Sequence, residues 1–355
     1  MDGHESGDAT ESRDARQTGA LSRFGPRVLH NRAVQAKRVR ATRGDAGRAI
    51  ERIARALLAG ALVLAWLPLR AAEVEDAARE QQFCDAGNAQ ACTNLGDAYR
   101  LGRGVGVDAA RAAALYERAC GAGDAAACSN LGSLLERGQG VPVDLERARA
   151  LYEKACDRAD ATACSNLGVL YEAGRAVEPN LNRAATLYRR ACSANDAGGC
   201  ANLARLYDIG RGLRADPRRA AELYERACEA DVLEACNSLG RLYEQGRGVE
   251  LDEFAAARLY MRAAQSDPRA MYNLGRFYES GRGPVPEKVE RAAELYEQAC
   301  AAGLADACFS LGARLARGGE ALSDPERARE FFERACQLGQ PEGCQRVGKT
   351  GAAAP

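Results

Sequence analysis

The sequence predicts an all-α protein, a right-handed α-solenoid of helix-turn-helix repeats with a 36-residue period. Cysteines occur in pairs eight positions apart, leucine-glycine steps recur in phase with them, and glycine-rich turns follow at a constant distance. A fixed period of this size is typical of repeat architectures. The cysteine pairs are Cys84 and Cys92, Cys120 and Cys128, Cys156 and Cys164, Cys192 and Cys200, Cys228 and Cys236, Cys300 and Cys308, and Cys336 and Cys344.

The first helix of each repeat, the A helix, is predicted from a leucine and a tyrosine four positions later, as in Leu95 and Tyr99. Residues at i and i+4 lie on one face of a helix. Glycine-rich turns such as Gly102-Arg103-Gly104 end these helices, because glycine adopts the left-handed conformation that a helix C-terminus requires.

The second helix, the B helix, is predicted to begin after a capping Asp or Asn, whose side chain accepts hydrogen bonds from the first turn. Pro217 and Pro325 follow two of these caps, at the position where a helix tolerates proline. An apolar stripe of helical period follows, which indicates that one helix face packs into the core. The predicted caps are Asp108, Asp144, Asn180, Asp216, Asp252 and Asp324.

The sixth repeat departs from the pattern. Ala264 and Met271 stand where cysteines are expected, and the Asn273–Gly275 step comes one residue early. The next turn, Gly281–Pro286, is one residue longer than the others, so the two offsets cancel. We expect the joint between Ala264 and Met271 to lack a cross-link and to be the place where the solenoid flexes.

The N-terminal region predicts export. Residues 1–47 have no apolar periodicity and are interpreted as a disordered or misassigned leader, and residues 48–72 as a signal peptide or membrane anchor. The apolar run Ala56–Leu67 is shorter than the roughly 20 residues of an ordinary membrane span. We expect the solenoid to occupy residues 73–348, with seven repeats and half-repeats at both ends, and residues 349–355 to form a disordered tail.

Charge and histidine content exclude several functions. Of 49 basic and 49 acidic residues, 13 and 7 lie in the first 72 positions, so the rest carries 36 basic and 42 acidic residues. A mildly acidic body disfavours nucleic acid. Both histidines, His4 and His30, lie in the leader, so the body lacks the commonest general base and metal ligand.

The recurring Asn-Leu-Gly-x-x-Tyr, Gly-x-Gly-Val and Ala-x-x-Leu-Tyr-x-x-Ala elements resemble the Sel-one-like repeat, a relative of the tetratricopeptide repeat, over roughly residues 75–348. The Cys-x7-Cys spacing is similar to that of the cysteine-rich secreted bacterial subfamily of Hcp type, some of whose members are filed as β-lactamases. This resemblance implies an α-solenoid. For activity it implies at most a β-lactam-binding or β-lactam-hydrolysing protein.

The cysteines are interpreted mainly as structural disulfides. The first cysteine of a pair ends a B helix and the second lies early in the next A helix, and a helical hairpin can bring their Cβ atoms within the roughly 4 Å that a disulfide needs. Zinc sites favour Cys-x2-4-Cys or histidine partners, redox catalysis favours Cys-x-x-Cys, and haem attachment needs Cys-x-x-Cys-His. None of these occurs in the body, but a thiol-redox or metallochaperone role stays open as a weaker alternative.

No catalytic residues are predicted. Serine β-lactamases use Ser-x-x-Lys, and no serine of the body is followed three positions later by lysine. Lys349-Thr350-Gly351 spells another of their motifs, but it lies in the tail beyond the last repeat and is interpreted as chance. Whether the protein is an enzyme stays open, with a non-enzymatic scaffold favoured.

The candidate binding surface follows from the tetratricopeptide resemblance, which places the A helices on the concave face. In repeats four to six a polar residue before the core leucine is joined by an arginine three positions later. Arginine suits carboxylates and phosphates. We expect a protein or peptide partner with an anionic or C-terminal group, although the polar residues could instead bond a neighbouring helix. The candidate residues are Asn202, Arg205, Ser238, Arg241, Asn273 and Arg276.

The remaining expectations concern assembly and location. We expect a monomer without cofactor or metal that contacts a membrane only through an uncleaved leader. Its compartment would be the periplasm, the cell envelope or the extracellular space, because so many cysteines are typical of oxidising environments.

Overall fold

The computed structural model describes residues 72–317 and 324–350. For Lys349 and Thr350 it describes the backbone only. The chain divides into two units, Met1–Ala72 and Glu73–Pro355, and everything below concerns the second. The predicted leader and signal peptide lie outside the described residues.

The described residues form helices joined by turns and loops and contain no strand. Residues 72–85 form a helix that precedes the first complete repeat. The helices that follow are α2 (Ala89–Leu101), α3 (Ala109–Gly121), α4 (Ala125–Arg137), α5 (Leu145–Asp157), α6 (Ala161–Ala173), α7 (Leu181–Ser193), α8 (Ala197–Ile209), α9 (Pro217–Glu229), α10 (Leu233–Gln245), α11 (Glu253–Ala263), α12 (Pro268–Ser280), α13 (Val289–Ala301), α14 (Ala305–Arg317), α15 (Pro325–Gln337) and α16 (Pro341–Thr350).

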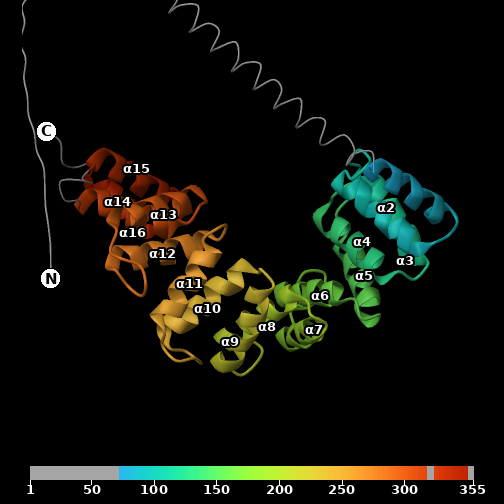
Figure 1. Cartoon of the computed structure of the whole chain (residues 1–355), viewed down its shortest axis with the longest axis horizontal. Coiled ribbons are helices and arrows are strands. Elements are labelled where there is room, and N and C mark those ends of the chain that lie inside the picture. Colours follow the sequence, from blue (N-terminus) through green and yellow to red (C-terminus); the bar gives the residue numbers. More distant parts are fainter. Residues whose placement is uncertain (1–71, 318–323, 351–355) are drawn as a thin grey trace, which may run out of the picture. The chain divides into compact units, whose positions relative to one another are not determined.

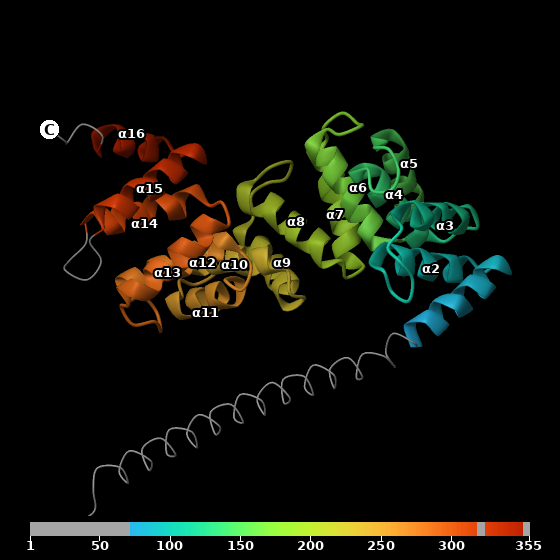
Figure 2. The same cartoon turned by 90° about the horizontal axis from the view of Figure 1, so that it is seen from above.

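Each helix packs against the next one along the chain, and successive A helices such as α6 and α8 also touch (Figure 1). The even-numbered helices are the A helices and the odd-numbered ones from α3 onward are the B helices. Figure 2 shows the same order from above, with α16 beside α15. Because each repeat contacts mainly its neighbours, this is the α-solenoid that the sequence predicts.

The core depends on close approach of a tyrosine to a glycine. Tyr188, which is fully buried, lies across α6, where a Cβ added to Gly168 would stand 2.6 Å from the tyrosine ring. The same pairing recurs in other repeats, for example between Gly132 and Tyr152. This explains why glycine, a poor helix former, recurs in the middle of the A helices.

The predicted caps of the B helices are confirmed. Each predicted Asp or Asn accepts a hydrogen bond from a backbone N–H three residues later, as Asp144 does from Arg147 at 2.9 Å. Lys288 occupies this position before α13, and no side chain caps that helix.

Seven disulfides join successive helices, as predicted, and include all fourteen cysteines of the chain. Their Cα atoms lie between 4.5 and 4.7 Å apart, and each bridge links the end of one B helix to the next A helix. Every turn closed in this way contains one residue of positive φ, three positions after the first cysteine. These residues are Gly87, Gly123, Ala159, Asn195, Asp231, Gly303 and Gly339.

The joint between α11 and α12 is different. Helix α11 has 11 residues where the other B helices from α3 to α15 have 13. Its turn, residues 264–267, contains no residue of positive φ, so the missing residue of this repeat is the left-handed one. Asp267 caps α12 through the backbone N–H of Arg269, but its second carboxylate oxygen is buried without a hydrogen-bond partner.

Candidate functional site

A row of carboxylates runs along the ends of the A helices. One acidic residue follows the recurring tyrosine or leucine in each of five successive repeats, and each is held by an arginine from the next repeat. We call these positions the carboxylate rungs. They are Glu136, Glu172, Asp208, Glu244 and Glu279.

The Glu172 rung shows the arrangement most fully. Arg205, from the following A helix, donates two hydrogen bonds to the two Glu172 oxygens at 2.8 and 2.7 Å. The buried Tyr188 hydroxyl donates a third at 2.9 Å. The hydrogen bonds from Arg205 lower the pKa of Glu172, while burial raises the pKa of Tyr188 well above its ordinary value. The glutamate is therefore ionised and the tyrosine stays a donor at neutral pH.

Asp208 is the most buried rung, with 1% of its side chain exposed. Arg241 donates to its Oδ2 at 2.7 Å, and the Arg247 guanidinium lies 2.9 Å from Oδ1, although that contact is not aligned as a hydrogen bond. Two arginines thus surround one desolvated carboxylate, which compensates the cost of burying its charge.

Glu244 is likewise contacted by two arginines in the next repeat. Arg276 lies 3.4 Å from Oε1 and Arg282 lies 2.8 Å from it, while Tyr260 donates to Oε2 at 2.6 Å. Burial opposes ionisation here, but the hydrogen bonds from Tyr260 and Arg282 and the nearby Arg276 charge outweigh it and lower the pKa of Glu244. Arg282 also pairs with Glu253, so it is held by two carboxylates of the preceding repeat.

The structure therefore brings the three predicted arginines into one series, but each of them is already paired with a carboxylate of the preceding repeat. Their side chains remain 40% to 46% exposed, so one edge of each guanidinium faces solvent. Around the rungs at Glu172, Asp208 and Glu244, six arginines meet four carboxylates, which leaves a surplus of two positive charges. The six are Arg205, Arg211, Arg241, Arg247, Arg276 and Arg282, and the four include Glu253.

The predicted polar residues have three different environments. The Asn273 side chain donates to Asn237 of the preceding A helix at 2.9 Å. This is the hydrogen bond to a neighbouring helix that the sequence analysis gave as the alternative to ligand binding. The Ser238 hydroxyl donates to the Glu234 carbonyl one turn earlier in its own helix at 2.9 Å. Asn202 is half-buried, and its side chain forms no hydrogen bond with another described residue. Among the three, Asn202 is therefore the side chain left available to a ligand.

The rungs themselves were missed from the sequence. The signal was present, because an acidic residue follows the tyrosine or leucine at the same phase in five repeats. Charged residues in phase on solenoid helices are usually solvated, and the sequence does not show that an arginine 33 positions later reaches back to them.

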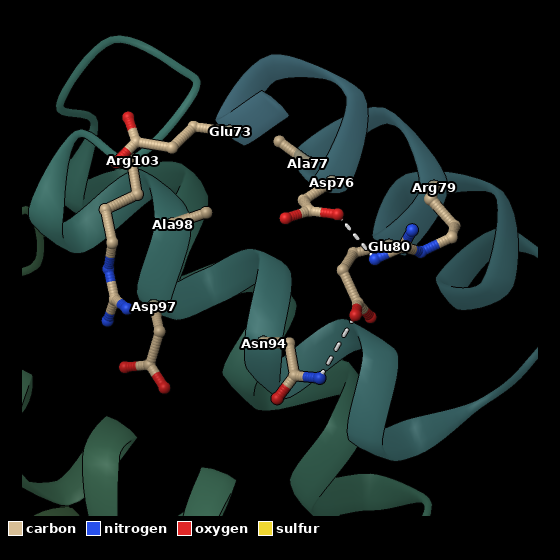
Figure 3. A pocket seen from close by; sticks show the side chains of 9 residues that line it. All are labelled: Glu73, Asp76, Ala77, Arg79, Glu80, Asn94, Asp97, Ala98 and Arg103. Atoms are coloured by element: carbon tan, nitrogen blue, oxygen red, sulfur yellow. Dashed lines mark hydrogen bonds and ion pairs between the residues drawn. The ribbon is translucent and has the colours of Figure 1, made fainter. Parts of the chain in front are cut away.

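A pocket of about 430 Å³ lies at the N-terminal end of the described solenoid, between residues 72–85 and α2 (Figure 3). Ala98 contributes to it, where the equivalent Leu134 and Leu170 of the next repeats are buried and fill the space. Its rim carries four carboxylates, from Glu73, Asp76, Glu80 and Asp97. Arg79 and Arg103 also line the pocket, so its lining keeps an excess of two negative charges, in contrast to repeats four to six.

Other site types have little support in the structure. The described residues contain no group of three or more His, Cys, Asp or Glu that could hold a metal ion. No helix in the described part of the chain is long and apolar enough to cross a membrane. The seven disulfides indicate an oxidising compartment, outside the cell or in the periplasm.

The fold and the A-helix surface define a class, the helical-repeat scaffolds whose extended faces bind other proteins. The Sel1 repeat model matches seven consecutive segments, and the chain belongs to the Sel1 repeat family. The matched segments are residues 89–124, 125–160, 161–196, 197–232, 233–267, 268–304 and 305–340. The fifth is one residue short and the sixth one residue long, in agreement with the compensating offsets seen in the sequence.

Two solved structures support the same assignment, and a third is similar over a shorter stretch. A protective antigen of uropathogenic Escherichia coli, c5321, with an SLR fold, is 28% identical over 78% of this chain and 60% of that chain, with a TM-score of 0.65. A Sel1 repeat protein from Oxalobacter formigenes is 27% identical over 63% and 96%, with a TM-score of 0.56. Helicobacter pylori cysteine-rich protein B is 27% identical over 38% and 96%, with a TM-score of 0.30. No curated protein matched the chain.

Proposed function

We propose that this protein is an exported scaffold that binds a protein or peptide partner on its A-helix surface, in the groove that such repeats form. The rungs of repeats four to six would hold an acidic side chain or a C-terminal carboxylate of the partner. The observation that carries the proposal is the exposed edge of Arg205, Arg241 and Arg276, with a local surplus of positive charge. Asn202 would add a hydrogen bond beside Arg205.

The rungs suit this task because they are fixed before a ligand arrives. Each arginine is held by a buried or half-buried carboxylate, so its rotamers are restricted and less side-chain entropy is lost on binding. The spacing is also regular, because each rung repeats with the solenoid period. An extended acidic peptide would therefore meet several guanidinium edges in succession.

The test compares a short glutamate-rich peptide bearing a free C-terminus with its C-terminal amide. We expect fluorescence anisotropy to show binding of the acidic peptide, and weaker binding of the amide if the terminus itself is held. The triple variant R205K/R241K/R276K keeps the charges that neutralise the rungs but loses the planar fork. It should weaken binding by about tenfold or more.

The matched control is R175K, which alters a comparable arginine that pairs with Glu136 outside this stretch. Its affinity for the peptide should equal that of the wild type. Unchanged binding by the triple variant would refute the proposed role of repeats four to six, whereas equal losses in both variants would show that the effect is not specific to these repeats.

The alternative of β-lactam binding or hydrolysis rests on the subfamily resemblance. Nitrocefin turnover by the purified oxidised protein is its direct test, and clear saturable hydrolysis would replace the scaffold proposal. The weaker thiol-redox or metallochaperone alternative requires accessible thiols, so a thiol count on the denatured protein tests it. We expect a count near zero, because every cysteine is paired.

A further inference from the structure

A tyrosine near the end of an A helix contacts the B helices on both sides of it. Tyr171 of α6 donates to Glu153 of α5 at 3.4 Å. Arg183 of α7 lies with its guanidinium carbon 4.5 Å from the centre of the Tyr171 ring and 3.9 Å from the same Glu153 oxygen. The glutamate therefore accepts the hydrogen bond of the tyrosine and compensates the charge of the arginine.

One repeat later the charge at the glutamate position is reversed. Arg189 of α7 stands where Glu153 stands in α5, so Tyr207 of α8 is contacted by two arginines. Arg219 of α9 lies 5.8 Å from the centre of the Tyr207 ring and donates to its hydroxyl at 3.4 Å. The Arg189 side chain lies within hydrogen-bonding reach of the same hydroxyl. We call Arg189, Tyr207 and Arg219 the paired-arginine site.

The Tyr207 hydroxyl accepts hydrogen bonds at this site. The hydrogen bond from Arg189 lowers the pKa of Tyr207, and Arg219 adds to this effect, while burial opposes it. No described residue accepts a hydrogen bond from this hydroxyl, so its proton is available to a ligand. Two guanidinium groups and one hydroxyl thus offer donors around a single point on the surface.

The charges between α7 and α9 are not balanced as they are in the clefts on either side. The α5–α7 cleft and the α9–α11 cleft are each lined by two carboxylates and two arginines, whereas the equivalent positions between α7 and α9 hold three arginines and one glutamate. The α5–α7 residues are Glu153, Asp157, Arg183 and Arg190. The α9–α11 residues are Glu225, Glu229, Arg258 and Arg262. The residues between α7 and α9 are Arg189, Ser193, Arg219, Glu222 and Arg226.

Asp216 compensates part of this excess. It caps α9 through the backbone N–H of Arg219 at 3.1 Å, and its other oxygen lies 3.4 Å from Nε of the same arginine. Arg189 and Arg226 form no ion pair with another described residue. Even with Asp216 and Glu222 counted, three arginines meet two carboxylates, and the position that Glu153 fills in the preceding repeat is occupied by a positive charge.

A pocket of about 430 Å³ lies beside Arg189, between α7 and the start of α6. Arg190, Thr186 and Ser193 also line it, and no carboxylate contributes to its lining, although Asp157 lies 3.9 Å from Arg190. The Ser193 side chain forms no hydrogen bond with another described residue. The pocket therefore offers room and polar contacts for a group attached to an anion at Arg189.

We propose that the paired-arginine site binds a phosphate monoester. The phosphate accepts hydrogen bonds from Arg189, Arg219 and the Tyr207 hydroxyl, and the group esterified to it occupies the adjacent pocket. A phosphate monoester carries about −1.5 to −2 charges at neutral pH and three acceptor oxygens, and guanidinium groups match its geometry. It therefore supplies the charge that two arginines require where one carboxylate serves a single arginine in the preceding repeat. The site is separate from the carboxylate rungs and does not depend on what binds there.

The probes are inorganic phosphate, glucose 6-phosphate, and phosphatidylcholine vesicles that contain phosphatidic acid. They present the same group free, on a soluble sugar and on a lipid headgroup. We expect NMR of the full oxidised protein to show glucose 6-phosphate shifting the side-chain N–H signals of Arg189 and Arg219, and acetate to bind at least about tenfold more weakly. The tightest of the three phosphate probes identifies the source of the group, and binding of none of them would overturn the proposal.

The variant Arg189→Glu tests the site without departing from the repeat pattern. Glutamate occupies the equivalent position in most B helices, so this variant should fold, which far-ultraviolet circular dichroism checks. It should bind the tightest phosphate probe at least about tenfold more weakly than the wild type. The matched control is Arg258→Glu, the same charge change at an exposed arginine of α11 without an ion pair, which should leave the affinity unchanged. The glutamates at the equivalent position are Glu117, Glu153, Glu225, Glu297 and Glu333.

The converse variant E153R/D157S copies Arg189 and Ser193 into the α5–α7 cleft, around Tyr171 and Arg183. It should create a second site, so that two equivalents of the phosphate probe bind where the wild type binds one. Unchanged affinity in Arg189→Glu would overturn the proposal, and so would an equal loss in Arg258→Glu, which would show attraction to net charge only. A single bound equivalent in folded E153R/D157S would show that two arginines around the tyrosine do not form the site.

Discussion

Two junctions, α5–α6 and α11–α12, each connect one repeat to the next but are stabilised differently. At the first, Cys156 is bridged to Cys164, Ala159 supplies the left-handed turn, and Arg190 of the next B helix donates to the Cys156 carbonyl at 2.7 Å. Four structural devices at this kind of junction can be compared: the disulfide, the left-handed residue, the basic clasp and the cap of the next helix.

The second junction lacks three of them. Ala264 and Met271 replace the cysteines, the left-handed residue is missing, and Gln298 stands where a basic residue would reach the Ala264 carbonyl. Only the cap remains, and its Asp267 is buried with one oxygen unpartnered. The disulfide, the left-handed residue and the basic side chain are thus absent from the same junction. We therefore expect this junction to open more readily than the others.

The largest effect is expected from removing one of the disulfides. C156A/C164A should cost about 2.5 kcal/mol of stability, the chain-entropy value for closing a loop of nine residues. Hydrogen exchange of the α5–α6 turn should then approach the rate of the α11–α12 turn in the wild type. Equal protection of the two turns in the wild-type protein would contradict the comparison at its root.

The converse change adds a disulfide to the α11–α12 junction. A264C/M271C with a glycine inserted after Ser266 restores both the spacing of eight and the left-handed position of the other turns. We expect complete disulfide formation in this variant and slower hydrogen exchange at the turn. A264C/M271C without the insertion is the control, and mass spectrometry should find its cross-linking less complete.

A smaller effect is expected from the basic clasp. R190Q removes the hydrogen bond to the Cys156 carbonyl and should destabilise that junction by about 1 kcal/mol. Q298R should add the equivalent bond to Ala264 and slow exchange in the α11–α12 turn. The two substitutions are reciprocal, so opposite signs are required, and changes of the same sign would show that the clasp does not distinguish the junctions.

The smallest effect concerns Asp267. Burial raises the pKa of Asp267, and the nearby Glu234 charge acts in the same direction, while Arg269 and its backbone N–H oppose them. Because the pKa of Asp267 is raised in the folded state, ionisation of this carboxylate lowers the stability of the fold. This loss of stability is absent below the ordinary aspartate pKa of about 3.9, grows as pH rises above it, and is complete above the raised pKa.

D267N keeps a capping oxygen without the charge, so it should stabilise the protein by up to about 1 kcal/mol near neutral pH. That gain should vanish below about pH 4, where wild-type Asp267 is protonated in both states. Urea unfolding at several pH values measures the difference. D160N, at a cap whose neighbours are stapled, is the control and should show no comparable gain.

The repeat phase was predictable because it depends on short-range patterns. Helix faces, caps such as Asp144 and disulfides such as Cys156–Cys164 are fixed by residues within one hairpin. The pairing of Arg205 with Glu172 was not predictable, since it joins residues 33 positions apart through the stacking of two A helices. The sequence therefore located the arginines of the candidate site but not the carboxylates that hold them.

The exposure of two apolar residues of α11 was missed for another reason. Phe254 and Met261 match the hydrophobic character of a solenoid helix, and only the placement of α11 shows that they face outward. For Asp267, the position before α12 is enough to predict a capping role. The burial of its second carboxylate oxygen without a hydrogen-bond partner is seen only in the structure. Both features lie in the fifth matched repeat, which is one residue short.

The missing bridge also changes what a single proteolytic cut would do. A cut inside any turn closed by a disulfide, such as residues 157–163, leaves the two pieces joined through sulfur. A cut within residues 264–267 has no bridge across it and would free the C-terminal repeats from covalent attachment without any reductant. Among the described turns that link one repeat to the next, this is therefore the one at which a single proteolytic cut would separate the chain into two pieces.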